Sequence, residues 1–480
     1  MGKARAVLAA VIILVVALVP PPAVEAQSPE VMQAIERVEE SVEEIRGLKF
    51  LEEVETRFMS QDELKQKLID DLNEDYTQDE WERDEGILKL LGFLEEDQDY
   101  YGLLLDLYTE QIAGFYSPAD KYLALISGEE SMNAYDRLVL SHELTHALQD
   151  QHFDLYRPPF HDPDSENNDA VFAASCLVEG DATVAMYAYM ETFTLKDQRE
   201  LQEAYGDIKS EKMDAAPRYI RDSLLFPYQE GEKFARRLRD KQGVTGLDEA
   251  FSRPPASTEQ VMHPEKYFAG EMPLPVECPD ISSGLGEGWE LKDTDVMGEF
   301  DIMELLMNEV KRADAERAAE GWGGCQYRYY VEGGSGEKLA VIDLAWDSQQ
   351  EAEEFAAVFS DYADSRCGFG SGSFRRDLGW YLWDGDGPVT GISMEGVSTR
   401  VLIADTANNA ERAAEALGAR GEGIEGLINR SEDGGVGSSG SNNASRVNMV
   451  LVVALVSALF LLGAALIAAM FFLLHKSGTA

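Results

Sequence analysis

The chain is short of basic side chains. Its 480 residues include 41 Lys and Arg against 89 Asp and Glu, which gives a formal net charge of −48. A surface this acidic repels phosphate backbones and anionic headgroups, so the composition argues against nucleic acid as a partner. It also disfavours acidic substrates, but it carries no information about the fold.

Cysteine is scarce as well, with four in the chain and no CxxC pair. The absence of CxxC excludes a zinc ribbon built from cysteines. Four cysteines are compatible with an exported protein, in which disulfides persist. Cys325 and Cys367 fall in the same C-terminal region, so we expect these two to pair. For Cys176 and Cys278, the sequence leaves open whether they are free, buried or paired.

The two ends of the chain predict a membrane protein. Residues 1–26 have the pattern of a secretory signal peptide, with basic residues before the apolar run Ala6–Val19 and a small residue at Ala26. An uncleaved N-terminal anchor is the alternative. A second apolar run, Met449–Leu474, has 26 residues without a formal charge, more than the ~20 that cross a bilayer core. We therefore predict a single-pass protein of the cell membrane, with its body on the extracytoplasmic side.

Between these ends, the hydrophobic fraction of 45% and the charged fraction of 27% are those of a globular protein of two or three domains. Helical spacing of apolar residues, with caps at Ser28, Ser60 and Thr77, predicts a mainly helical N-terminal region over 27–108. A core domain over 109–270 follows. It begins with two short strands within Gln111–Ile126 and continues with helices over 134–153 and about 170–194.

The pattern of the C-terminal part is mixed, with helices and strands alternating, which predicts a smaller α+β domain. The fold class expected for the whole chain is α+β, with one C-terminal transmembrane helix. The remaining boundaries are a connector at 271–295, the accessory α+β domain at 296–430, a Gly/Ser-rich tether at 431–448, the transmembrane helix at 449–474 and a cytoplasmic tail at 475–480.

The segment His142-Glu143-Leu144-Thr145-His146 carries the chemistry. Residues four apart share one face of a helix, so His142 and His146 can hold one metal ion with their imidazoles side by side. Glu143 is rotated about 100° from His142, which lets it reach a metal-bound water without displacing it. Zinc lowers the pKa of such a water toward ~7, and a carboxylate can then act as general base. The segment therefore predicts one catalytic Zn²⁺.

A catalytic zinc has three protein ligands and one open position. The best candidate for the third ligand is Glu179, because a lone acid in an apolar helix is costly unless it is paired or bound to a metal. We expect Asp181 or Thr183 to orient an imidazole from behind.

The rival third ligand is His152, at the spacing of the long motif HExxHxxGxxH, with Met262 as its methionine turn. That motif needs Gly where this chain has Gln149. If the helix continues, His152 points away from the ion.

HELTHALQDQ, followed by VEGDATVAMY, resembles the gluzincin clan of zinc metallopeptidases. The resemblance covers about residues 100–270 and implies a mainly helical catalytic domain with a small sheet edge, GFYSPADKYLALI, that aligns the substrate backbone. The exopeptidase signature GxMEN is absent, which argues against an aminopeptidase. Within the clan, PPASTEQVMHPEKY and GWGG are similar to motifs of a group of secreted or membrane-anchored prokaryotic members.

Enzymes of this kind also need a donor for the developing oxyanion. His263 is the first choice and Tyr267 the second, with Tyr219 and Tyr228 as further options. The sequence thus predicts a membrane-anchored zinc endopeptidase that acts on peptide or protein substrates. A surface binding or adhesion protein with a structural zinc site is the alternative, and a zinc hydrolase of non-peptide amides is a third. The oligomeric state is left open.

Overall fold

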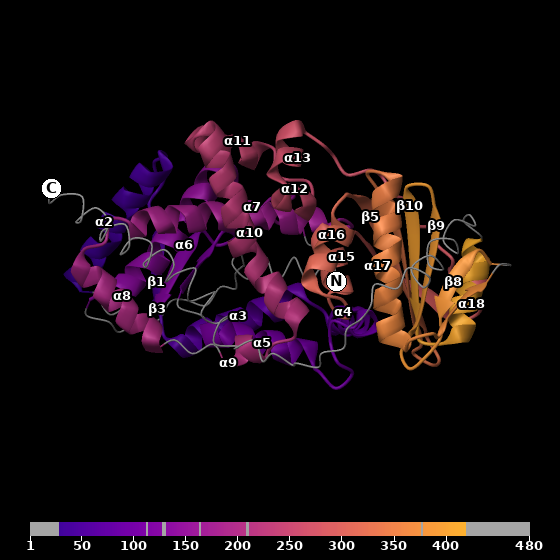
Figure 1. Ribbon diagram of the computed structural model, residues 1–480. Helices are drawn as coiled ribbons and strands as arrows, with labels where there is room; N and C mark the ends of the chain where they lie inside the picture. Colours follow the sequence, from indigo (N-terminus) through magenta and orange to yellow (C-terminus); the bar gives the residue numbers. More distant parts are fainter. Residues whose placement is uncertain are drawn as a thin grey trace.

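The computed structural model of the protein describes residues 28–111, 114–126, 131–162, 165–207, 211–375 and 378–418. The predicted signal peptide, tether, transmembrane helix and tail lie outside these residues. Within them the fold is a mixture of helices and two sheets, as expected for the α+β class. Figure 1 shows a helical part with a small sheet on the left and a larger sheet on the right.

The described helices before the larger sheet are α2 (Pro29–Arg46), α3 (Gln61–Asp75), α4 (Gln78–Leu91), α5 (Tyr100–Gln111), α6 (Ala134–Phe153), α7 (Asn168–Met190), α8 (Leu195–Asp207), α9 (Glu211–Ala215), α10 (Arg218–Gln242), α11 (Val244–Ser252), α12 (Thr258–Met262), α13 (Pro264–Ala269) and α14 (Ser282–Leu285). Several begin where the sequence predicts: Ser28, Ser60 and Thr77 all cap helices. The last two form complete capping boxes, which satisfy backbone donors that the first helical turn leaves unpaired.

A three-stranded sheet lies beside α6 and has the strand order β1-β3-β2. Its strands are β1 (Glu55–Met59), β2 (Gly114–Ser117) and β3 (Tyr122–Ile126). The β2–β3 hairpin agrees with the two predicted strands. Strand β1 belongs to the N-terminal region, was not predicted, and pairs in parallel with β3. The N-terminal region therefore completes a sheet of the predicted core domain, so the two share structure across the predicted boundary at residue 108.

The larger sheet has seven strands in the order β4-β5-β6-β10-β9-β8-β7, all antiparallel. Its strands and helices are β4 (Trp289–Asp295), α15 (Glu299–Leu306), α16 (Arg312–Ala319), β5 (Trp322–Glu332), β6 (Lys338–Trp346), α17 (Gln349–Cys367), β7 (Gly372–Arg375), β8 (Trp380–Trp383), β9 (Val389–Glu395), β10 (Ser398–Ala404) and α18 (Ala407–Leu417). Figure 1 shows α17 on one face and α18 on the other.

The helical part and the larger sheet share a hydrophobic core. Phe226 of α10, Phe172 of α7 and Phe300 of α15 pack against one another: the ring centroid of Phe226 is 5.5 Å from that of Phe172 and 4.4 Å from that of Phe300, and the last two are 5.7 Å apart. The same cluster of buried residues continues through Trp322 and Tyr327 of β5. Because apolar area is removed from water on both sides, this contact fixes the larger sheet against the helices that carry the candidate site.

The predicted disulfide between Cys325 and Cys367 is wrong, since the structure joins neither cysteine in a disulfide, and all four cysteines are buried. Cys367 contacts the carbonyl of Pro388, just before β9, through its sulfur at 3.5 Å. Cys325 lies in β5, three strands from β9 in the sheet order. Neighbouring strands are about 4.8 Å apart, so three steps are about 14 Å, whereas disulfide-bonded Cα atoms lie about 4.4–6.8 Å apart.

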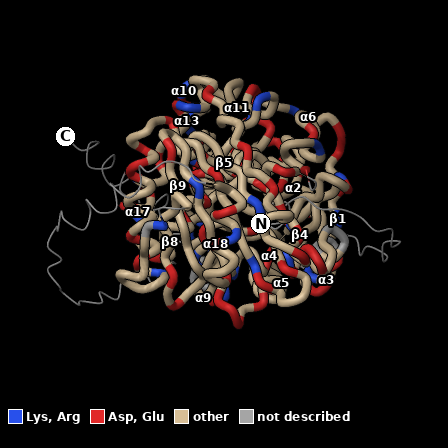
Figure 2. The backbone as a smooth tube through the Cα atoms, turned by 90° about the vertical axis from the view of Figure 1, so that its right-hand side faces the viewer, with Lys and Arg blue, Asp and Glu red and all other residues tan. Residues whose placement is uncertain are grey.

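The long apolar helix α7 meets the length and composition of a membrane span, and it is the only such helix among the residues described. It is almost entirely buried against α6 and α10, as expected for the central helix of a folded core. The acidic surface is visible in Figure 2, where Asp and Glu are spread over the face shown and outnumber Lys and Arg.

Candidate metal centre

Helix α6 has the bounds that the sequence predicts, Ala134–Phe153, and runs without a break through both histidines. Asn133 caps it and forms a capping box with Asp136. Leu138, Leu144 and Leu148 pack into the apolar cluster beneath the small sheet. This packing holds the helix in the interior, so His142 and His146 project from one face into a buried space, with 8% and 1% of their surface exposed.

Helix α7 brings Glu179 to the two histidines. Its position depends on a close helix–helix contact, because Gly180 lies directly against Gly231 of α10. A Cβ at residue 180 would lie only 2.0 Å from the carbonyl oxygen of Gly231, so no larger residue fits without moving the backbone. The contact also brings Tyr228 of α10 over the same site.

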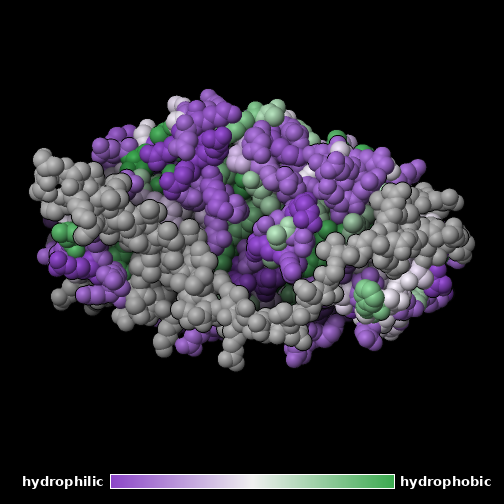
Figure 3. Space-filling model, in the orientation of Figure 1, coloured by the Kyte–Doolittle hydropathy of each residue, from purple (hydrophilic) through white to green (hydrophobic). Residues whose placement is uncertain are grey.

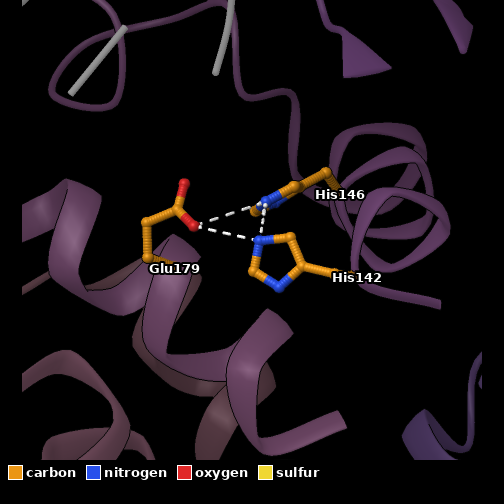
Figure 4. Close-up of side chains that lie close together, drawn as sticks. All are labelled: His142, His146 and Glu179. Atoms are coloured by element: carbon orange, nitrogen blue, oxygen red, sulfur yellow. Dashed lines mark hydrogen bonds and ion pairs between the residues drawn. The ribbon is translucent and has the colours of Figure 1, made fainter. Parts of the chain in front are cut away.

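Three candidate ligand atoms converge, as Figure 4 shows. The two Nε2 atoms of His142 and His146 are 3.0 Å apart, and Glu179 Oε2 lies 3.2 and 3.6 Å from them. Zn²⁺ in a tetrahedral site, with bonds of about 2.0–2.1 Å, requires ligand atoms about 3.3–3.4 Å apart. The triangle has nearly these dimensions, so the residues fit one zinc ion.

The electrostatics of the triangle favour a cation. Burial alone would raise the pKa of Glu179, but His146 and His142 lower it to about 2. Burial would likewise lower the pKa of His146, and Glu179 raises it to about 9. The carboxylate is therefore charged and buried, and it stabilises positive charge beside it. A divalent metal ion would take the place of the histidine proton.

Glu143 lies in the same space, 8% exposed. Its Oε2 accepts a hydrogen bond of 2.9 Å from the backbone N–H of Tyr116 in β2. The hydroxyl of Tyr116 donates to Asp150, which also pairs with Lys121 at 2.7 Å. These bonds join the edge strand β2 to α6. Burial raises the pKa of Glu143, although the two histidines oppose this.

A chain of buried polar groups supports His146 from behind. His146 Nδ1 lies 3.0 Å from Gln149 Oε1, and Gln149 Nε2 donates to Asp181 at 3.0 Å. Arg46 of α2 donates to the same Asp181 oxygen, also at 3.0 Å. Asp181 therefore acts through Gln149 rather than directly on an imidazole. The hydroxyl of Thr183, the other residue predicted for this role, has no hydrogen-bond partner in the structure.

Tyr228 is the tyrosine at the candidate centre. Its hydroxyl is close enough to Glu179 and Glu143 for both carboxylates to act on it electrostatically. Its ring lies nearly parallel to that of His142, with centroids 6.0 Å apart. Burial, and secondarily Glu179, raises the pKa of its hydroxyl well above the usual value, so the group stays protonated and can donate.

The other donors considered from the sequence are engaged elsewhere. His263, the first choice, points Nε2 at Glu299 at 2.9 Å and lies at the end of α12. The hydroxyl of Tyr267 donates to the carbonyl of Arg253, and that of Tyr219 to Asp301. The structure thus favours Tyr228 over these three as a donor near the metal ligands.

His152, the rival third ligand, lies near the exposed end of α6. Its Nε2 lies 2.8 Å from the carbonyl oxygen of Lys49. Because α6 continues unbroken to Phe153, His152 faces away from His146, and it is not part of the converging group. Met262 is partly buried and lines a separate cleft.

Comparisons with known proteins give one family model and a similar crystal structure. A family model described as a domain of unknown function, DUF8575, matches residues 288–416, which span the seven-stranded sheet with α15–α18. No curated protein matches the chain. A crystal structure from Chloroflexus aurantiacus, described as a "putative hydrolase with a novel fold", is similar at 15% identity and a TM-score of 0.36, covering 56% of this chain and 96% of that one. A TM-score this low carries no argument about fold or activity.

Proposed function

We propose that the protein is a zinc-dependent peptidase whose metal is held by His142, His146 and Glu179. The observation that carries the proposal is the convergence of these three side chains, at distances that fit one tetrahedral ion, beside the carboxylate of Glu143. Two ligands on one helix and a carboxylate on the next also support a relationship to the gluzincins, as the sequence resemblance implies.

A bound Zn²⁺ would polarise a substrate carbonyl and lower the pKa of a water toward about 7. Glu143 is the general base of the proposed reaction: it takes a proton from the attacking water and returns it to the leaving amine. Tyr228 donates its hydroxyl hydrogen to the oxygen on which negative charge develops. Gln149 holds His146 in one orientation, because it accepts from the imidazole and is itself held by Asp181.

The proposed substrate is a peptide or protein. Strand β2 is an edge of the small sheet, so its outer backbone groups can pair with an extended chain. Its Tyr116 is bonded to Glu143, which places such a chain beside the general base. We further propose that residues 449–474 anchor the protein in the cell membrane, because this run is uncharged and longer than a bilayer core requires.

The test is zinc per chain, measured by elemental mass spectrometry on the full-length protein, together with cleavage of an unstructured protein such as casein. We expect about one zinc in the unmodified chain and a sharp loss in Glu179→Ala. The matched control is His152→Ala, which removes a histidine of the same helix outside the triangle and should leave zinc unchanged. Glu143→Gln should keep the zinc and lose cleavage.

Two results would count against the proposal. Zinc that survives Glu179→Ala but is lost in His152→Ala would show that the third ligand is His152 and not Glu179. Zinc without any cleavage of proteins or peptides, before and after Glu143→Gln, would instead favour a surface binding protein with a structural metal.

A further inference from the structure

A second concave site lies apart from the proposed metal ligands. It is a cleft of about 800 Å³ between α10, the end of α12 and the pair α15–α16, so both the helical part and the domain of the larger sheet form its walls. Figure 3 shows the surface hollowed at its centre, between the segments that Figure 1 labels α10 and α16.

The walls of this cleft carry more negative than positive charge. Its lining includes six acids, Asp222, Glu230, Glu299, Glu304, Glu316 and Glu320, and three arginines. The arginines are engaged by acids of the protein: Arg221 and Arg312 share Asp222, at 3.1 and 3.3 Å, and Arg317 pairs with Asp314 at 3.0 Å. Some of the acids are paired as well, Glu316 with Arg312 at 3.5 Å and Glu230 with Lys233 at 2.7 Å. Six acids against three arginines give the lining itself a formal charge of −3, with His263 taken as neutral, which favours a cation.

Two of the acids are buried and only half satisfied. Glu299 and Glu304 are 1% and 0% exposed. One oxygen of Glu299 is bonded to His263, and one oxygen of Glu304 to Arg218, but the second oxygen of each has no hydrogen-bond partner. Burial raises the pKa of both groups, that of Glu304 to about 7. A buried acceptor without a partner is costly, and a cation in the cleft would reduce that cost.

The rest of the wall is apolar. Phe226 and Phe300 contact each other at a centroid distance of 4.4 Å and line the cleft with Met262 and Met303. A ligand that matches the site needs an apolar part beside its positive charge. A lysine or arginine side chain next to an aromatic or aliphatic residue in a peptide meets both requirements.

Helix α10 is a wall shared by the cleft and the metal centre. Its Tyr228 faces His142 and Glu179, whereas Phe226 and Gln229, two and one residues away, line the cleft. We propose that the cleft is a second binding site for the substrate peptide, selective for segments that combine a basic and an apolar side chain. This assignment rests on the proposed peptidase function.

The test measures peptide binding by the full-length protein carrying Glu143→Gln, which prevents cleavage. The probes are two fluorescein-labelled decapeptides of alternating Lys and Phe or alternating Glu and Phe, followed by fluorescence anisotropy. The rim variant is Glu316→Gln with Glu320→Gln, because both side chains are exposed at the cleft. The matched control is Glu36→Gln with Glu40→Gln, two exposed acids at the same spacing on α2.

We expect the basic peptide alone to bind, and the rim variant to weaken it roughly three- to tenfold, the effect of two exposed charges. The control should bind as the parent does. Equal binding of both peptides would overturn the proposed selectivity of the cleft. An equal loss of affinity in the rim and control variants would overturn the cleft as the binding site, since the attraction would then come from the acidic surface as a whole.

Cleavage by the unmodified protein separates this inference from the peptidase proposal. The KM for cleavage could be the same for substrates with and without basic residues, and unchanged in the rim variant. That result would overturn the proposed role of the cleft in peptide binding and leave the peptidase proposal intact. Rim-dependent binding without any cleavage would overturn the peptidase assignment and leave a cation-binding cleft.

Discussion

The role of Gln149 in positioning His146, one of the proposed metal ligands, can be tested quantitatively. It is 1% exposed and makes three hydrogen bonds of 3.0 Å, to His146, to the carbonyl of Val178 and to Asp181. In Gln149→Leu all three are lost. Asp181 keeps its bond to Arg46, and the Val178 carbonyl, in the interior of α7, keeps its helical hydrogen bond, so only the imidazole of His146 is left without a partner.

One orphaned buried group costs about 1–3 kcal/mol, so we expect a loss of about 1–3 kcal/mol in the free energy of unfolding, partly offset by the buried leucine. The imidazole also loses the bond that fixes its orientation. Removing such a partner weakens metal binding about 10–100-fold.

The assays are zinc affinity by competition with a chromophoric chelator and stability by urea denaturation of the metal-free protein. The control is Gln151→Leu, which changes a half-buried glutamine two residues along the same helix. Its side chain bonds to residues 51 and 52 instead. A zinc affinity within threefold of the parent, or an equal loss in the control, would refute the view that Gln149 positions His146.

Three further predictions follow from the geometry. Tyr228→Phe should lower kcat about 100-fold or more with zinc content unchanged, because it removes only the proposed oxyanion donor; an unchanged kcat would return attention to His263. Gly180→Ala should destabilise the protein by at least about 1–3 kcal/mol in thermal unfolding, since its methyl group would meet the Gly231 carbonyl oxygen at 2.0 Å. The control is Gly336→Ala: this glycine has open space around it but a positive φ, so the substitution should cost only the strain of that backbone conformation. A thiol reagent should label none of the four cysteines in the native protein and all four after denaturation, because all are buried and the structure joins none of them in a disulfide; two reactive thiols in the denatured, unreduced protein would reveal a disulfide.

The sequence predicts local features well because local chemistry sets them. The bounds of α6 follow from a capping asparagine and an apolar pattern, and the β2–β3 hairpin follows from a turn between two short runs. Strand β1 has no comparable signal, since none of its side chains is fully buried and its partner β3 lies more than 60 residues later. The same limit explains the incorrect cysteine pairing, because shared location in sequence says nothing about strand order.

In the candidate site, too, the residues set by local spacing are predictable from the sequence, and those set by long-range contacts are not. His142, Glu143 and His146 are specified by spacing on one helix, and Glu179 by the cost of an acid in an apolar helix. Gln149 was considered only as the residue that breaks a longer motif, although its place three residues after His146 on the same face could have suggested contact. Tyr228 was one option among several, and nothing local to its sequence links it to Glu179.

Arg46 shows why the N-terminal region belongs to the proposed metal centre. It lies 135 residues before Asp181, yet its guanidinium is 3% exposed and bonds both Asp181 and Asp248. A buried ion pair contributes little net stability, because desolvation offsets the attraction, but removing one partner leaves a costly charge in the interior. Its effect is therefore on position: Asp181 is held between Arg46 and Gln149, and Gln149 is held against His146. The orientation of the proposed metal ligand His146 on α6 thus depends on α2. A catalytic unit beginning at residue 109 would lack Arg46, the first residue of this chain of hydrogen bonds.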